Sequence, residues 1–154
     1  IIRNEVIMFT SHFEVEKTWI DHNEHMNVSY YHYAFQQALN RYWEHILKKK
    51  NNSSADLALS PKNVHIRYLS EAFLGQLIDV HSFIYKSDYK GFSVYQEMKR
   101  DDTILCLFNQ HVNFCTASEA LIRQCDNTTY NSLHTIVKNT DIVLPKWIER
   151  SIDI

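Results

Sequence analysis

Residues 19–27 read Trp-Ile-Asp-His-Asn-Glu-His-Met-Asn, and this run comes immediately before a long helical pattern. A carboxylate (Asp21), an amide (Asn23), an imidazole (His25) and a second amide (Asn27) stand at alternating positions. Side chains two residues apart in an extended segment point to the same side, so we expect these four polar groups to converge on one spot. A helix that begins just beyond them would direct unpaired backbone N–H groups at the same spot. Such a combination is suited to acyl-transfer chemistry.

The residues from Val28 to about Leu47 have the spacing of an amphipathic helix. Their apolar side chains recur every three or four positions and form one wide stripe over about five turns. The stripe consists of Tyr31, Ala34, Phe35, Ala38, Leu39, Tyr42, Ile46 and Leu47. The sequence therefore predicts one long helix over 28–47.

Most of the remaining long patterns are those of β-strands. Residues 13–19 alternate apolar and charged side chains, which predicts a strand that leads into the motif. Four further segments are rich in β-branched and aromatic residues, and they span 64–68, 76–86, 92–98 and 103–114. Because the connections between these segments are short, we expect an antiparallel meander.

The last forty or so residues give weaker patterns. Residues 118–123 suit either a continuing strand or a turn. Two short helices are expected over 131–139 and 144–152, the second entered through Pro145.

The order of the elements limits the fold. A single helix with one apolar stripe cannot cover both faces of a sheet of this size, but the sheet can wrap around the helix. A chain of 154 residues fits one domain. We therefore expect an α+β protein whose residues 1–154 form a single domain, and the exposed part of the sheet suggests self-association.

The composition is that of an ordinary soluble globular protein, with 45% hydrophobic residues, 22% charged residues and a formal net charge of −2. This charge gives no electrostatic argument for a nucleic-acid partner. No apolar stretch reaches the roughly 18 residues that a membrane span requires. Residues 1–5 also lack the regions of a signal peptide. We therefore expect a cytoplasmic protein that binds neither membranes nor nucleic acid.

Local structure alone offers a second interpretation of the motif. Asp and Asn cap helices and form turns, and this run precedes a helix. One cap needs only one short polar side chain, however, whereas this run has several close together.

A zinc site at His22 and His25 is disfavoured, because no Cys pair accompanies them and alternation puts them on opposite sides. No metal or cofactor is expected.

A cysteine nucleophile is also poorly supported. The three cysteines are too widely spaced for a Cys-x-x-Cys pair, and none follows a helix start or a basic cluster that would lower its pKa. We expect them to be small buried hydrophobes, which leaves Asp21 as the best catalytic candidate.

The run from Trp19 to Tyr31 resembles the signature Asp-x-Asn-x-His-(Val/Met)-Asn of the hot-dog thioesterases. It is most similar to the 4-hydroxybenzoyl-CoA thioesterase-like and acyl-ACP thioesterase branches, and the resemblance extends through the strand order to about Phe114. It implies one long central helix wrapped by a curved antiparallel β-sheet. It further implies a homodimer or dimer of dimers that pairs sheet to sheet, with active sites at the dimer interface. The implied activity is hydrolysis of an acyl-CoA or acyl-ACP thioester.

The resemblance also assigns site residues by position. Asp21 is then the catalytic carboxylate, with Asn23 and His25 as its accompanying polar groups. Expected substrate-binding residues lie at the helix entrance and in a second segment contributed by the opposite subunit; they are Asn27, Val28, Ser29, Tyr31, Lys90, Gly91 and Tyr95. Backbone N–H groups around 28–30 would hold the carbonyl oxygen. Asp21 would either attack the carbonyl or deprotonate a water molecule.

The second segment has an ordinary explanation beside the functional one. Residues 87–91 form a polar turn, and a hairpin with Gly91 at a positive φ would account for them. Cations around this turn would suit CoA phosphates or simply form a solvated rim; they are Lys86, Lys90, Lys99 and Arg100.

Two positions depart from the relatives. Glu24 stands where Gly or Gln is frequent, which could alter the turn or add a second carboxylate, and Val28 replaces a frequent second Asn. The alternative function is a hot-dog protein that binds an acyl thioester or a related ligand without turning it over. An unrelated interaction protein is a further alternative. A hot-dog dehydratase is disfavoured, because its His-x-x-x-x-Gly-x-x-Pro type of signature is absent.

Overall fold

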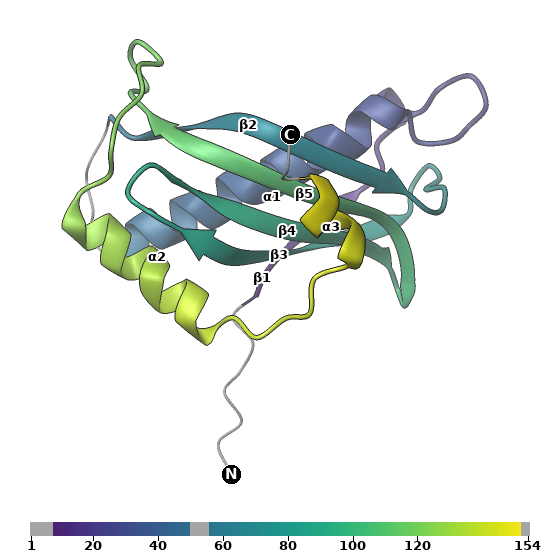
Figure 1. Cartoon of the computed structure of the whole chain (residues 1–154). Coiled ribbons are helices and arrows are strands. Elements are labelled where there is room, and N and C mark those ends of the chain that lie inside the picture. Colours follow the sequence, from purple (N-terminus) through teal and green to yellow (C-terminus); the bar gives the residue numbers. More distant parts are fainter. Residues whose placement is uncertain (1–7, 50–55, 152–154) are drawn as a thin grey trace.

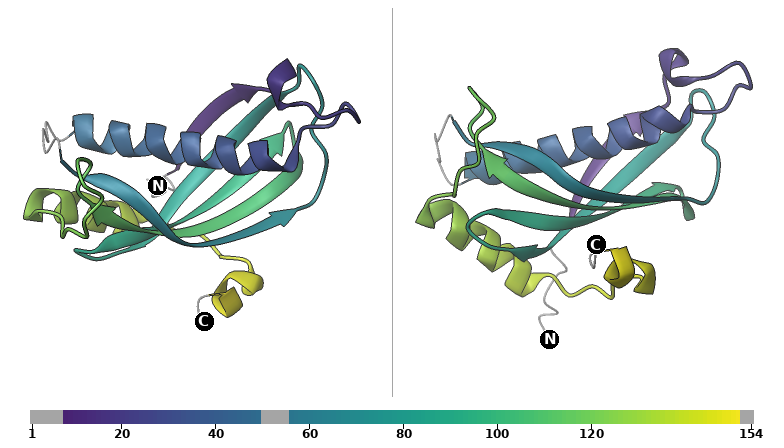
Figure 2. Two further views of the ribbon diagram at one scale, coloured as in Figure 1. Left: turned by 90° about the horizontal axis from the view of Figure 1, so that it is seen from above. Right: turned by 45° about the horizontal axis from the view of Figure 1, so that its top comes forward.

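The computed structural model describes residues 8–49 and 56–151, which form a five-stranded sheet and three α-helices (Figure 1). The elements are β1 (Phe9–Glu14), a 3-10 helix (Lys17–Trp19), α1 (Val28–Lys49), β2 (Ala58–Tyr68), β3 (Leu77–Ser87), β4 (Gly91–Arg100), β5 (Thr103–Cys115), α2 (Asn127–Asn139) and α3 (Lys146–Ser151). The curved sheet wraps the long helix α1, as the resemblance to the hot-dog fold implied (Figure 2).

The long helix predicted over 28–47 is confirmed, since α1 spans Val28–Lys49. Its apolar stripe is buried against the sheet, where Ala34, Phe35 and Ala38 have no exposed surface. Phe35 stacks on Phe108 of β5 with ring centroids 4.7 Å apart. The small alanines allow the backbones of helix and sheet to approach, while the rings fill the remaining space.

The sheet is entirely antiparallel, and its strands lie in the order β1-β3-β4-β5-β2. The expected meander holds only for β3, β4 and β5, because β2 pairs with β5 at the far edge rather than with β3. The connection from β2 to β3, residues 69–76, therefore crosses β5 and β4, from the edge strand β2 to β3, which lies next to the other edge strand β1. It passes the start of α1 on the way (Figure 2).

Two strand boundaries differ from the predictions. The strand predicted over 64–68 begins earlier, at Ala58, and includes Pro61. Pro61 is tolerated because β2 is an edge strand whose register shifts between Pro61 and Asn63. The strand predicted over 13–19 instead spans Phe9–Glu14, and the prediction is wrong beyond Glu14 because the chain turns into the 3-10 helix. That turn buries Trp19, which stacks on Tyr30 of α1 with ring centroids 5.6 Å apart.

The two C-terminal helices are confirmed in outline as α2 and α3, and residues 117–119 form a turn. Residue 152 of the second predicted helix, and residues 1–5, on which the signal-peptide argument rests, lie outside the described residues. Helix α3 lies on the face of the sheet opposite α1 (Figure 2). No helix among the described residues is long and apolar enough to cross a membrane.

Candidate active site

Helix α1 begins with an asparagine cap. The Asn27 side-chain oxygen accepts hydrogen bonds from the Ser29 N–H (2.9 Å) and the Ser29 hydroxyl (2.8 Å). The Tyr30 N–H donates to the Asn27 carbonyl at 2.9 Å. The Val28 N–H has no hydrogen-bond partner among the described residues. Of the N–H groups expected to hold a carbonyl oxygen, that of Val28 is therefore the one left available.

The segment before the helix is a tight hairpin rather than the extended run that the alternation suggested. Ile20 pairs with Met26, the Asp21 N–H donates to the His25 carbonyl at 3.1 Å, and the Glu24 N–H donates to the Asp21 carbonyl at 3.1 Å. Strict alternation thus fails between residues 21 and 25, because the chain reverses there. The Asp21 side chain hydrogen-bonds within the turn, where its carboxylate accepts the Asn23 N–H at 2.9 Å. Asn23 is exposed at the tip.

Glu24 takes the left-handed backbone conformation, with φ of 65°. This conformation is unfavourable for residues with a Cβ and easy for glycine. Glycine would therefore be favoured at this position, and Glu24 strains the hairpin that contains Asp21.

The β2–β3 connection packs against both the hairpin and α1. The Met26 N–H donates to the Ala72 carbonyl at 2.8 Å, and His25 pairs with Phe73 as an isolated bridge. The Tyr31 hydroxyl accepts the Ala72 N–H at 3.0 Å and donates to the Ser70 carbonyl at 3.4 Å. Burial raises the pKa of Tyr31, so this hydroxyl keeps its proton. Tyr31, expected to bind substrate, has its hydroxyl engaged with the loop.

Arg100 holds the same connection from the sheet side. Its guanidinium donates to the Glu71 carbonyl at 2.7 Å and to the Gln76 side-chain oxygen at 2.9 Å. Sequence reasoning grouped Arg100 and Lys99 with Lys86 and Lys90 around one turn. This was wrong, because Lys99 and Arg100 end β4 whereas Gly91 begins it.

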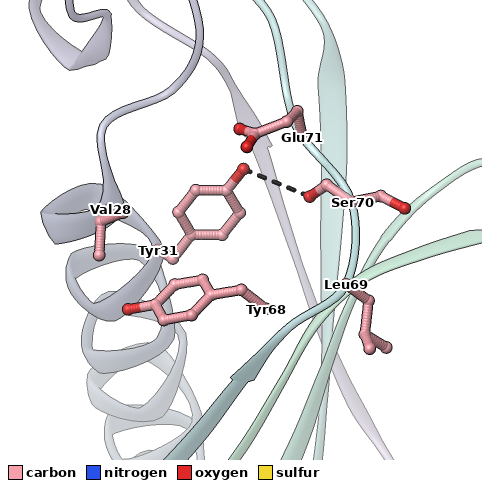
Figure 3. A pocket seen from close by; sticks show the side chains of 6 residues that line it. All are labelled: Val28, Tyr31, Tyr68, Leu69, Ser70 and Glu71. Carbon is pink, nitrogen blue, oxygen red and sulfur yellow. Dashed lines mark hydrogen bonds between the residues drawn. The ribbon is translucent and has the colours of Figure 1, made fainter.

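A pocket lies where the connection meets the start of α1 (Figure 3). It has a volume of about 190 Å³ and is lined by Val28, Tyr31, Tyr68, Leu69, Ser70 and Glu71. Its lining combines the Tyr31 and Tyr68 rings and the aliphatic Val28 and Leu69 with the polar residues Ser70 and Glu71, and Val28 carries the available N–H described above. The pocket opens to solvent, and the apolar part of its lining offers a surface to an acyl or aryl group.

Glu71 is the functional candidate that sequence reasoning missed. One of its carboxylate oxygens lies 3.8 Å from the His25 Nδ1, a separation typical of an ion pair rather than a hydrogen bond. The Glu71 side chain also lies beside the Tyr31 hydroxyl (Figure 3). No local pattern marks Glu71, because it stands in a connection whose path depends on the strand order.

The remaining expected substrate-binding residues lie elsewhere in the chain. Lys90 is exposed in the β3–β4 hairpin, where its carbonyl accepts the Phe114 N–H at 2.8 Å. That hairpin packs beside the end of α1, not its start. Tyr95 is buried on the other face of the sheet, in a cluster with Leu107 and Ile148. A role for these residues in the pocket at Val28 would require a second subunit.

Gly91 does not have the positive φ that the sequence suggested. Gly75 has a positive φ instead, of 80°. Gly91 is required by a close approach, since a Cβ there would lie 1.9 Å from the Val112 carbonyl oxygen. Its presence therefore has a structural explanation.

The cysteines are buried and unpaired, as expected. Burial raises the pKa of Cys106 to about 12 and that of Cys125 to about 11, so both thiols are protonated at neutral pH. Across residues 8–49 and 56–151, no three His, Cys, Asp or Glu side chains are grouped as metal ligands.

Comparison with known proteins bears on this site. The family model of the thioesterase-like superfamily matches residues 15–141. No curated protein sequence matches the chain. A hypothetical protein from Staphylococcus aureus, solved in complex with CoA, is 25% identical with a TM-score of 0.80, over 97% of this chain and 96% of that one.

Two further solved structures share the fold at lower identity. A presumed thioesterase from Pseudomonas putida is 22% identical with a TM-score of 0.78, over 97% of both chains. A 1,4-dihydroxy-2-naphthoyl-CoA thioesterase from Synechocystis is 16% identical with a TM-score of 0.64, over 83% of this chain and 96% of that one. The hot-dog fold is confirmed by these structures, and the match over residues 15–141 shows that the chain belongs to the thioesterase-like superfamily.

Proposed function

We propose that this protein hydrolyses the thioester of an acyl-CoA, or of an acyl-ACP, at the start of α1. The observation that carries the proposal is the available Val28 N–H, which stands at a helix N-terminus and beside the pocket. Thioester hydrolysis builds negative charge on the carbonyl oxygen, and a fixed N–H at the positive end of a helix stabilises that charge.

Asp21 is the proposed catalytic carboxylate. It either deprotonates a water molecule that attacks the carbonyl carbon, or attacks that carbon itself and forms an anhydride that water then cleaves. In both routes the carbon–sulfur bond breaks, and the sulfur leaves as a thiolate that must gain a proton. Asn23 and His25 are proposed to assist Asp21, although the Asn23 side chain would have to turn from the hairpin tip to do so.

His25 and Glu71 are proposed to supply the leaving sulfur with its proton. The imidazole is the proton donor, and the Glu71 carboxylate 3.8 Å away orients it. Asn27 and Ser29 then act through the helix cap, because their side chains bond each other and leave Val28 free.

Two comparisons support a CoA thioester as the substrate. The Staphylococcus aureus protein was solved with CoA, and the Synechocystis protein is named as a thioesterase of an aryl-CoA. The proposed assembly is a homodimer or dimer of dimers. The position of β2 at the edge of the sheet that the described residues form supports it, because an open strand edge is a template for pairing with another chain.

The test is thiol release from a panel of short, long and aromatic acyl-CoAs, detected with a thiol reagent. The variant Asp21→Asn should abolish hydrolysis while the hairpin persists, because an asparagine oxygen can still accept the Asn23 N–H. Asp102→Asn, in the exposed β4–β5 turn, is the matched control and should retain full activity.

Full activity of Asp21→Asn would contradict the catalytic assignment. Saturable binding of acyl-CoAs by the wild type without thiol release would favour the alternative, a hot-dog protein that binds the thioester without turnover.

A further inference from the structure

Three glutamine amides form a polar chain between α1 and the sheet, in which Gln96 and Gln110 are buried and Gln36 is partly buried. The Gln96 amide nitrogen donates to the Phe35 carbonyl and to the Ser82 hydroxyl, both at 3.0 Å. The Gln110 amide nitrogen donates to the Gln96 oxygen at 2.8 Å, and the Gln36 amide nitrogen donates to the Gln110 oxygen at 3.0 Å. Gln96, Gln110 and Ser82 have no exposed surface. Buried amides are unfavourable unless they are paired, and these are paired in series.

The direction of this chain follows from its inner end. A backbone carbonyl only accepts hydrogen bonds, so Gln96 must present its nitrogen to Phe35 and its oxygen to Gln110. Gln110 must then present its nitrogen to Gln96 and its oxygen to Gln36. The orientation of all three amides is therefore determined, and the Gln36 amide nitrogen must point toward Gln110.

At the outer end, the Gln36 oxygen remains as an acceptor. The Gln36 nitrogen also lies 3.3 Å from the His32 Nε2, one helical turn earlier. Among the described residues, nothing donates a hydrogen bond to the Gln36 side-chain oxygen. Gln36 is only partly buried, so its oxygen is open to solvent. The chain thus holds a solvent-facing acceptor at a fixed place on α1.

That acceptor lies on the same face of α1 as the candidate active site. Val28, His32 and Gln36 are four residues apart and form one stripe, which we call the 28/32/36 stripe. A rise of 1.5 Å per residue places Gln36 about 12 Å along the helix from Val28. Val28 lines the pocket, and Gln36 hydrogen-bonds to Gln110. Between them, the His32 ring packs on the Phe108 ring with centroids 5.2 Å apart.

Strand β2 lies along the stripe. Val64 pairs with Gln110, Ile66 with Phe108 and Tyr68 with Cys106, so these β2 side chains share the face of the sheet that α1 covers. Val64 and Tyr68 nevertheless remain 41% and 45% exposed. An apolar wall therefore continues from the pocket along the 28/32/36 stripe as far as Gln36.

We propose that the 28/32/36 stripe binds the distal part of the acyl group, and that the Gln36 oxygen accepts a hydrogen bond from a hydroxyl carried by that group. The inference rests on the proposed function, which places the thioester carbonyl at Val28. The substrate class is then an acyl chain with a hydroxyl about 12 Å from its carbonyl. An acyl chain that covers the Gln36 oxygen removes its water, and a hydroxyl that replaces this water favours such a chain over its apolar analogue.

The test compares 10-hydroxydecanoyl-CoA with undecanoyl-CoA, in which a methyl group replaces the hydroxyl. Hydrolysis of the two substrates is compared by kcat/KM. Binding is compared by the dissociation constants of two 2-oxoalkyl thioethers of CoA, which carry the same two chains and cannot be hydrolysed. In Gln36→Met, the preference for the hydroxylated chain should fall about tenfold in both measurements. Gln37→Met, at the neighbouring position, is the matched control and should keep the wild-type preference.

A second measurement needs no variant, because Gln36→Met leaves the Gln110 oxygen without its donor and could fold poorly. Moving the hydroxyl along the chain in wild-type assays should give a preference that peaks near the ten-carbon position. An unchanged preference in folded Gln36→Met, or a flat profile in the wild type, would overturn the inference. Absence of thiol release from every acyl-CoA would instead refute hydrolysis, and the thioether affinities would still decide the role of Gln36.

Discussion

The His25 imidazole faces the Glu71 carboxylate across 3.8 Å, which joins the hairpin before α1 to the connection between β2 and β3. Both side chains are about half exposed, at 42% and 56%. An ion pair of this exposure contributes little to stability, about 1 kcal/mol at most. Its effect is therefore expected in activity rather than in folding.

We predict that Glu71→Gln lowers kcat about tenfold or more and leaves the melting temperature nearly unchanged, because the amide cannot orient the His25 imidazole as a carboxylate does. Steady-state kinetics with an acyl-CoA substrate and thermal unfolding measure the two quantities. Glu119→Gln, in the exposed turn after β5, is the control and should affect neither. Equal kcat in Glu71→Gln and the wild type would remove Glu71 from the mechanism.

Tyr31→Phe is expected to destabilise the fold by about 1–3 kcal/mol, because the fully buried Ala72 N–H loses its acceptor. Urea denaturation measures the change. Activity should fall as well, since the same hydroxyl holds the loop beside the pocket. Tyr33→Phe, whose ring is 47% exposed on α1, is the matched control and should be nearly neutral. A loss of the same size in both variants would show that the Ala72 contact is unimportant.

Glu24→Gly should stabilise the protein by about 1 kcal/mol, because it relieves the left-handed conformation at φ of 65°. Glu24→Ala keeps a Cβ and should give no such gain. The midpoints of thermal unfolding compare the three proteins. If glycine and alanine raised the midpoint equally, the gain would come from removing the carboxylate and not from the backbone.

A pH dependence is expected from His81 on β3. Burial, and secondarily the nearby Lys99, lower the pKa of His81 below its ordinary value of 6.5. The unfolded chain therefore binds a proton more readily than the native one, so this contribution to stability is present above pH 6.5 and is lost as the pH falls through the lower native pKa. In His81→Gln, the decline of the unfolding free energy below that pH should be shallower than in the wild type. Parallel declines would mean that His81 does not contribute.

The sequence predicted the elements far better than their arrangement. Helix α1 and strands β3, β4 and β5 follow from side-chain periodicity, which is a local property. The position of β2 beside β5 depends on long-range pairing, and short connections misleadingly suggested a simple meander. The end of β1 was missed because packing of Trp19 on Tyr30 overrides a good strand pattern.

The candidate site shows the same division. Asp21, His25 and Val28 could be found because they are neighbours in one motif. Glu71 could not, since it reaches the site through the crossing of the β2–β3 connection. Arg100 was named only as a cation for CoA phosphates, whereas it holds that connection from the end of β4. Alternation also failed at residues 21–25, where hydrogen bonds between Asp21, Glu24 and His25 close a hairpin that a two-residue period does not reveal.

The β2–β3 connection is anchored almost wholly through its main chain. The Ser70, Glu71 and Ala72 carbonyls accept from Tyr31, Arg100 and Met26. The Leu69 and Ser70 N–H groups both donate to the Leu105 carbonyl. Because backbone groups do the anchoring, the exposed side chains of Leu69, Phe73 and Leu74 can vary without displacing the loop. Leu69 lines the pocket. This position is thus a place where new substrate preferences can evolve, or be engineered, on a constant frame.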